Sequence, residues 1–153
     1  MTTIAANDSD RNAVPAAVDR ARNRLLTLPD LFQIAEHLMA LGRTQDAAEL
    51  YKTWIAFNAD GPLVHLASFN LSIALRQSGD MAGAINALRA CIKQDPCFGQ
   101  AHINLGRTLE DCGQIELAVR QWQGFAELEA GITAERATAQ RSTGARGRPR
   151  RTA

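Results

Sequence analysis

The side chains that could do chemistry are few, and the best spaced of them are a cysteine and a histidine. Cys97 and His102 lie five positions apart, close enough to meet at the start of a helix, and only Cys91 could join them as a third ligand. A zinc site needs three or four side chains that converge within ~2.3 Å of the ion. Cys91 and Cys112 fall on helix positions that small core residues usually occupy, so packing explains them better. We therefore expect no metal and no other cofactor.

Sequence motifs for catalysis are missing as well. The sequence has no Gly-x-x-x-x-Gly-Lys loop that could cradle phosphate and no Gly-x-Ser-x-Gly turn that could expose a nucleophile. The adjacent acids Glu110 and Asp111 fall on a predicted helix surface, where carboxylates are ordinarily solvated. Trp54 and Trp122 fall at apolar positions of predicted helices, where they would pack in the core. We predict that the chain by itself is not an enzyme.

Composition places the chain among single-domain globular proteins. Apolar residues make up 46% and charged residues 22% of its 153 residues, and Val, Ile and Thr form no alternating runs of the kind that build sheets. No apolar run reaches the ~18 residues of a membrane span, and the polar N-terminus lacks a signal-peptide core. Three cysteines are an odd number and do not indicate a disulfide framework. We expect a cytoplasmic protein that does not contact the membrane.

The net charge of +1 conceals a basic C-terminal stretch. All sixteen acidic residues lie at or before Glu135, whereas residues 136–153 hold six arginines and no acid. This stretch has no large apolar side chain to bury, and residues 1–12 are polar and without periodicity. Segments of this kind cannot offset the entropy lost on ordering. We therefore expect residues 1–12 and 136–153 to be disordered.

Within the basic stretch, residues 146–149 read Arg-Gly-Arg-Pro, which matches the core of an AT-hook motif. In that motif, arginines on a flat backbone enter the narrow, electronegative minor groove of A·T-rich DNA. The competing interpretation is a solvated tail with nonspecific, salt-sensitive attraction to any polyanion. Nucleic-acid binding is therefore an alternative function, carried by Arg146, Arg148, Arg150 and Arg151.

A repeat of 34 residues organises the middle of the chain. Residues 70–80 recur as residues 104–114, and a fainter copy lies upstream around residues 41–43. Each copy has apolar residues at the i, i+3, i+4, i+7 spacing of a helix face, then a glycine suited to end a helix, then a second amphipathic stretch. Three helical hairpins, at about 29–58, 62–94 and 98–125, account for most of the chain.

In each copy the first helix holds a Leu-Gly pair or its equivalent, the turn holds a glycine, and the second helix holds an early alanine. The matching residues are Leu105-Gly106, Gly113 and Ala118 in the third copy, Leu71, Gly79, Ala84 and Pro96 in the second, and Ile34-Ala35, Gly42 and Ala47 in the first. This pattern resembles that of tetratricopeptide repeats. The resemblance implies an all-α fold, a right-handed α-solenoid of about three helical hairpins with flanking capping helices.

The expected domain boundaries follow from the repeat. The tetratricopeptide domain spans residues 29–135, with repeats at about 28–61, 65–98 and 99–132. A capping helix at residues 13–28 precedes it, with one apolar face that would cover the first repeat. The residues of that face are Val14, Val18, Ala21, Leu25 and Leu28.

Residues 51–55, 69–71 and 101–110, followed by Gln121-Trp122, carry a narrower resemblance. They look like the repeat region ahead of the catalytic domain in bacterial SPINDLY-type O-linked N-acetylglucosamine transferases. In that family a large C-terminal domain uses a UDP-sugar donor, and the residues after Trp122 could not form such a domain. The resemblance therefore implies a truncated or stand-alone repeat segment, an alternative to an independent interaction module.

The first helices of stacked hairpins would line a concave face along which an extended peptide can lie. Asn70 and Asn104 occupy equivalent first-helix positions, with Gln33 in the first copy. A side-chain amide offers both a donor and an acceptor, so it can pair with a peptide backbone of any sequence. The resemblance to the transferases implies an asparagine ladder of this kind. The alternative is that the amides cap or bridge neighbouring helices.

The predicted peptide-binding residues are Asn70, Asn104, Phe69, Ile73, Arg76, Gln77, Ile103, Arg107, Glu110 and Asp111. This mixture suits an extended peptide with some apolar side chains, so we expect a protein or peptide partner. Because about three repeats is the smallest stable array, self-association that buries the ends of the array stays open.

Overall fold

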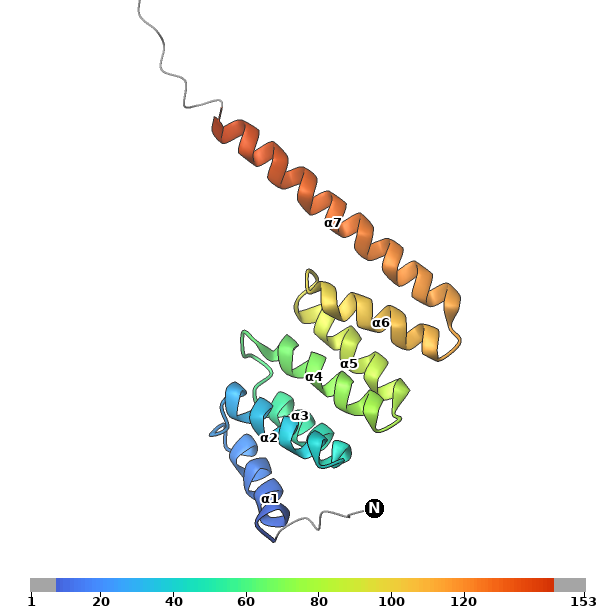
Figure 1. Cartoon of the computed structure of the whole chain (residues 1–153). Coiled ribbons are helices and arrows are strands. Elements are labelled where there is room, and N and C mark those ends of the chain that lie inside the picture. Colours follow the sequence, from blue (N-terminus) through green and yellow to red (C-terminus); the bar gives the residue numbers. More distant parts are fainter. Residues whose placement is uncertain (1–7, 145–153) are drawn as a thin grey trace, which may run out of the picture.

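The computed structural model describes residues 8–144, with side chains described from Val14 to Ala139. Within that range the chain forms seven α-helices and no strand. The helices are α1 (Asp8–Arg22), α2 (Leu28–Ala40), α3 (Thr44–Phe57), α4 (Val64–Gln77), α5 (Met81–Gln94), α6 (Gly99–Asp111) and α7 (Ile115–Gly144). They stack beside one another from α1 at one end to α7 at the other (Figure 1). The predicted all-α solenoid is confirmed.

Three turns of the same geometry join the helices into the hairpins α2–α3, α4–α5 and α6–α7. Each turn contains a glycine with positive φ, at 74° in Gly42, 86° in Gly79 and 73° in Gly113. In the second turn the N–H of Asp80 donates to the carbonyl of Leu75 at 2.9 Å, and the other two turns make the equivalent bond. This Schellman pattern satisfies the last carbonyls of the first helix. It needs glycine because a Cβ strains the left-handed conformation.

Small residues let the helices pack closely around the core. Ala47, Ala84 and Ala118 hold equivalent positions early in the second helices, and each is at most 1% exposed. In the third repeat, Gly106 of α6 lies against the indole of Trp122, and a Cβ on Gly106 would collide with its Nε1 atom. One buried cluster extends from α1 to α5 and a second from α5 to α7. Because α5 contributes to both clusters, the core continues along the whole stack.

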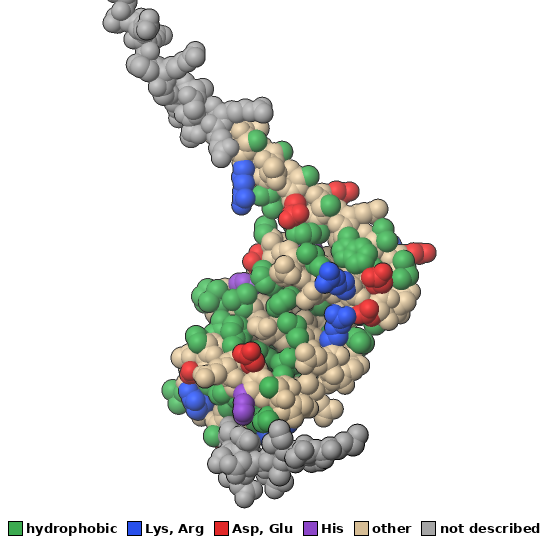
Figure 2. Space-filling model, viewed as in Figure 1, with side chains coloured by type: hydrophobic (Ala, Val, Ile, Leu, Met, Phe, Trp, Pro, Cys, Tyr) green, Lys and Arg blue, Asp and Glu red, His purple; other side chains and the backbone are tan. Residues whose placement is uncertain are grey.

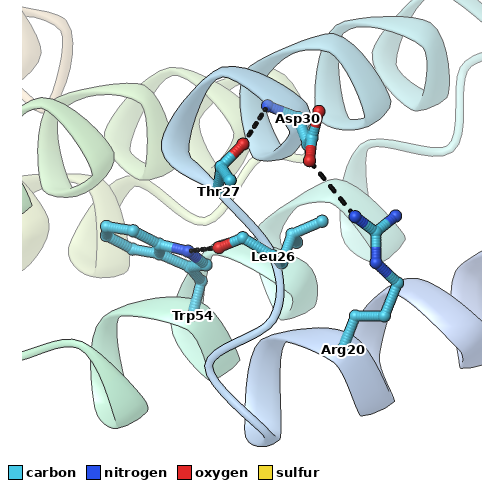
Figure 3. A network of polar contacts seen from close by, with 5 residues as sticks. All are labelled: Arg20, Leu26, Thr27, Asp30 and Trp54. Atoms are coloured by element: carbon cyan, nitrogen blue, oxygen red, sulfur yellow. Dashed lines mark hydrogen bonds and ion pairs between the residues drawn. The ribbon is translucent and has the colours of Figure 1, made fainter.

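The N-terminal end of the stack is closed by α1 and the loop that follows it. Ala17 and Ala21 of α1 are buried, and α1 packs on α3. The indole Nε1 of Trp54 in α3 donates to the carbonyl of Leu26 at 2.8 Å, which fastens the loop to the core (Figure 3). Because this bond pairs two polar groups beneath the loop, neither is left unsatisfied.

Polar contacts on the outside of the same loop set the start of α2 (Figure 3). The hydroxyl of Thr27 accepts from the N–H of Asp30 at 3.3 Å and so caps the helix. The carboxylate of Asp30 then pairs with Arg20 of α1 at 3.1 Å. Both charged side chains are nearly half exposed, so this ion pair adds little stability.

The capping helix differs from its predicted bounds. α1 begins at Asp8, inside the stretch 1–12 that we expected to be disordered, and ends at Arg22 rather than at residue 28. Arg24 then turns the chain with a φ of 56°. As a result Leu26 is 2% exposed, whereas Leu25, which we predicted on the buried face, is 67% exposed. The prediction for Leu25 was wrong because a helical register does not continue across such a turn.

At the opposite end, α7 continues to Gly144, so residues 136–144 are helical where we predicted disorder. This segment holds two Ala, two Arg and one Gln, which have high helix propensity, and extending a helix that already exists avoids the cost of nucleation. A segment can therefore be helical without a core of its own. Residues 145–153 lie outside the described part of the chain.

A candidate peptide groove between first helices

A hollow of about 360 Å³ lies between the first helices α4 and α6, with α5 beneath it. Its lining residues are Ser72, Ile73, Arg76 and Gln77 of α4, Met81 and Leu88 of α5, and Asn104, Thr108 and Asp111 of α6. Figure 2 shows hydrophobic side chains through the middle of the stack, with basic and acidic side chains close together beside them. Because most of its lining residues belong to α4 and α6, the hollow lies on the surface that these two first helices form.

The interior of the hollow is apolar. Ile73 and Met81 are half-buried, and Leu88 is 1% exposed. The hydroxyls of Ser72 and Thr108 donate to carbonyls of their own helices, at 2.6 and 2.7 Å. Because these hydroxyls already have acceptors, they add little polarity to the lining. The space suits an aliphatic side chain.

Side-chain amides stand at the edge of this hollow. Gln77 and Asn104 line it, and neither amide makes a hydrogen bond with any residue that the structure describes. The same is true of the amide of Asn70. Capping or bridging of helices by these amides therefore has no support among residues 14–139, whose side chains the structure describes. Each amide keeps a donor and an acceptor for a ligand.

An ion pair crosses from one repeat to the next at the same place. The guanidinium of Arg76 in α4 lies 2.5 Å from the carboxylate of Asp111 in α6, and their side chains are 42% and 43% exposed. A pair this exposed contributes about 0–1 kcal/mol. The pair matters more for the electrostatics of the hollow than for stability, because the two charges neutralise each other. The hollow therefore has no net charge from these two predicted residues.

The structure brings together five of the ten predicted peptide-binding residues, namely Ile73, Arg76, Gln77, Asn104 and Asp111. The other five do not line the hollow: Asn70, Phe69, Ile103, Arg107 and Glu110. Phe69 instead packs edge-on against Phe98, with ring centroids 5.2 Å apart, and belongs to the second core cluster. Its ring packs between repeats, and its role in peptide binding stays a prediction.

Sequence reasoning missed four lining residues, namely Ser72, Met81, Leu88 and Thr108. Two of them belong to the second helix α5, whereas we had predicted a groove lined by first helices. One signal was available, because Met81 and Leu88 are seven positions apart and so share a helix face. That face reaches the groove where neighbouring first helices leave a gap.

His102 has a structural place rather than a metal-binding one. Its Nε2 lies 2.9 Å from the carbonyl oxygen of Pro96, its Nδ1 lies 2.7 Å from Nε2 of Gln121, and its ring stacks on Phe125 at 4.4 Å. These contacts join the loop before α6 to α7. Among the described residues, no three His, Cys, Asp or Glu side chains are grouped so that they could hold a metal ion.

The cysteines differ in their surroundings. Burial, with a smaller effect from the Asp95 carboxylate, raises the pKa of Cys91 to about 12. Its thiol is therefore protonated and unreactive near neutral pH. Cys97 and Cys112 are exposed.

Two further sequence predictions concern nucleic acid and the membrane. The arginines predicted to contact nucleic acid lie outside the described residues, namely Arg146, Arg148, Arg150 and Arg151. No helix in the described range is both long and apolar enough to cross a bilayer.

Comparison with known families identifies the repeats. The tetratricopeptide repeat family model matches residues 32–96 and 69–123, which together cover more than half of the chain. The chain belongs to the tetratricopeptide repeat family. The family and the fold support a protein–protein interaction module. They give no support to the narrower resemblance to SPINDLY-type transferases, which stays a prediction.

Similar solved structures agree with this assignment. One crystal structure of MamA is 19% identical with a TM-score of 0.60, covering 80% of this chain and 70% of that one. A second crystal structure of the MamA protein is also 19% identical, with a TM-score of 0.64, and covers 82% of this chain and 67% of that one. At this identity the likeness shows the fold alone. No curated protein sequence gives a significant match.

Proposed function

We propose that this chain is a non-catalytic interaction module that holds an extended segment of a partner protein between α4 and α6. The supporting observation is the unpaired amide of Asn104 beside the apolar hollow. An extended peptide presents alternating N–H and C=O groups, and one amide can satisfy one of each. The adjacent side chain of the peptide can then enter the hollow.

The lining also limits the kind of peptide. Ile73, Met81 and Leu88 favour one aliphatic side chain, because burying apolar surface drives such contacts. Since Arg76 and Asp111 are paired with each other, a charged side chain finds no single opposite charge there. We infer a neutral, aliphatic anchor within an extended segment, held by backbone hydrogen bonds on either side.

The test uses randomised peptides displayed on phage, selected on the whole protein, with affinities then measured by fluorescence polarisation. Asn104→Ala removes one amide and should weaken a selected peptide by about tenfold, the value of one or two hydrogen bonds. Asn86→Ala is the matched control, because Asn86 is an exposed asparagine of α5 that does not line the hollow. Failure to select any peptide, or equal effects of the two variants, would contradict the proposal.

The absence of catalysis is also part of the proposal. The purified protein, incubated with UDP-N-acetylglucosamine and acceptor peptides, should transfer no sugar above the rate without protein. Measurable turnover that scales with protein concentration would overturn this and favour the transferase resemblance. A cytoplasmic location likewise stays a prediction.

The nucleic-acid alternative needs a truncation placed by the structure. A chain that ends at Gly144 removes Arg146, Arg148, Arg150 and Arg151 and keeps α7 whole. If the alternative is wrong, the full chain binds A·T-rich and G·C-rich DNA equally weakly, and salt abolishes both. Selective A·T binding that is lost in the truncated chain would favour it.

A further inference from the structure

One side of α7 carries an apolar row that is more exposed than the equivalent rows of α3 and α5. The rows at equivalent positions are Ala48, Tyr51 and Ile55 in α3, Ile85, Leu88 and Ile92 in α5, and Val119, Trp122 and Ala126 in α7. α3 packs against both α2 and α4, and α5 packs against both α4 and α6. α7 packs on α6, where Trp122 lies against Gly106. Ile85 is 7% exposed, whereas Val119 is 40% exposed. In the described part of the chain no helix follows α7 to cover the third row.

The row on α7 is also longer than the other two. Its members, which we call the α7 stripe, are Ile115, Val119, Trp122, Ala126, Ala130, Thr133 and Ala137. At about 100° per residue, these positions fall within an arc of about 80° on the helix surface. None of them is charged. The hydroxyl of Thr133 donates to the carbonyl of Glu129 at 2.8 Å, so its methyl group can face an apolar partner.

The spacing of the α7 stripe reads the same in both directions. Steps of four, three and four residues lead from Ile115 to Ala126, and the same steps lead from Ala126 to Ala137. Two copies of α7 can therefore pair antiparallel with Ala126 opposite itself. The facing pairs are then Ile115 with Ala137, Val119 with Thr133, and Trp122 with Ala130. Ile115 and Trp122 each meet an alanine, and Val119 meets a threonine of similar size, so large side chains face small ones at two of the three pairs, as in closely packed helices.

Neither residues 145–153 nor α1 suits this face as a cover. Residues 145–153 consist only of Arg, Gly, Pro, Thr and Ala, so they have no large apolar side chain to place on it. α1 lies at the far end of the stack (Figure 1). A second copy, in contrast, brings an identical stripe, and a two-fold axis lets one surface serve both chains.

We propose that a second copy of this chain covers the α7 stripe, through antiparallel pairing of the two α7 helices about a two-fold axis at Ala126. This surface is separate from the groove between α4 and α6, so the proposal does not depend on the proposed function. Groove variants such as Asn104→Ala should leave the association unchanged.

The first test measures the mass of the whole protein in solution by sedimentation over a range of concentrations. Val119→Glu places a charge in the interface and should weaken dimerisation by roughly a hundredfold or more. Leu128→Glu is the matched control, because Leu128 is 37% exposed on the same helix but points about 180° away from the stripe. The control should remain dimeric. Circular dichroism verifies that both variants stay folded.

A second test places a cysteine on the axis. In a background with Cys97→Ser and Cys112→Ser, Ala126→Cys should form a disulfide-linked dimer on mild oxidation, because two Cα atoms across a close two-fold contact lie within disulfide reach. Leu128→Cys should not cross-link. A wild-type protein that stays monomeric up to roughly 100 µM, where an interface of ordinary size is assembled, would overturn the proposal. Cross-linking by Leu128→Cys instead, or loss of the dimer in both glutamate variants, would overturn it as well.

Discussion

The two ends of the solenoid are finished in different ways. At the N-terminal end α1 packs on α3, and Leu26 is 2% exposed beneath a loop that Trp54 fastens. At the C-terminal end, no helix in the described part of the chain follows α7, and Ile115 is 53% exposed. Each repeat builds the same apolar positions, so the repeats alone cannot finish either end. The difference shows that closing an end takes a helix outside the repeats, such as α1, which can come from the chain itself or from another molecule.

The largest expected effect comes from opening the closed end. Trp54→Ala removes a side chain that is 6% exposed and should lower the free energy of unfolding by about 3–5 kcal/mol. Trp122→Ala at the open end removes a half-buried indole and should cost about 1–2 kcal/mol, because less area leaves water there on folding. Urea unfolding followed by circular dichroism, at low protein concentration, measures both. Equal losses would contradict the contrast between the ends.

The next largest effect on stability comes from filling the space between α6 and α7 at the open end. Gly106→Ala forces a Cβ against the indole of Trp122 and should destabilise the protein by about 1–3 kcal/mol. Gly124→Ala is its opposite, because nothing lies within 4 Å of a Cβ at Gly124 in α7. That change should stabilise the protein by about 0.5–1 kcal/mol through helix propensity. Thermal unfolding compares the two, and a shift of the same sign in both would contradict the packing described for Trp122.

A smaller loss of stability is expected at alkaline pH, through Tyr51 of α3 near the closed end. Burial, and to a lesser extent Glu36, raises the pKa of Tyr51 from 10.0 to about 12. The folded protein then keeps a proton that the unfolded chain has lost, so stability falls as the pH rises from 10 to 12. Tyr51→Phe should flatten this part of the profile. Urea unfolding at pH 8, 10 and 11 tests it, and an unchanged slope in the variant would count against burial of the phenol.

The smallest expected effects are those of the exposed ion pairs. Arg20→Ala at the closed end and Arg76→Ala at the groove should each lower stability by no more than about 1 kcal/mol, because exposed pairs are screened by solvent. Added salt should shrink both losses further. A loss well above this for Arg20→Ala would show that α1 is held by its surface charge rather than by Ala17, Ala21 and the loop.

Local features of the fold could be predicted from the sequence. The hairpins follow from apolar spacing and from Gly42, Gly79 and Gly113, since a helix end needs only nearby residues to form. The ends were harder. Leu25 was misplaced because a single residue with positive φ, Arg24, shifts everything after it. The extension of α7 was missed because helix propensity, not burial, carries it.

The candidate site could be predicted only in part, for a related reason. Periodicity says which face of α4 or α6 a residue occupies, and this placed Ile73 and Asn104 correctly at the hollow. It does not say how deep the gap between two helices is, so it could not show that Leu88, a core residue of α5, also lines the hollow. It also cannot show that Arg76 and Asp111, which are 35 positions apart, neutralise each other.

Because the three glycine turns share one geometry, one hairpin could be exchanged for another or duplicated. The glycine turn and the alanine after it recur in each hairpin, and the Ala-Leu-Leu series of the first helix that begins at Ala67 recurs at Ala101. An inserted duplicate of residues 65–98 would therefore pack against helices with the same residues at the contact positions. Such an insertion would add one more hollow to the groove without touching either terminus. The length of the proposed binding surface is then set by the number of repeats, which changes in whole steps.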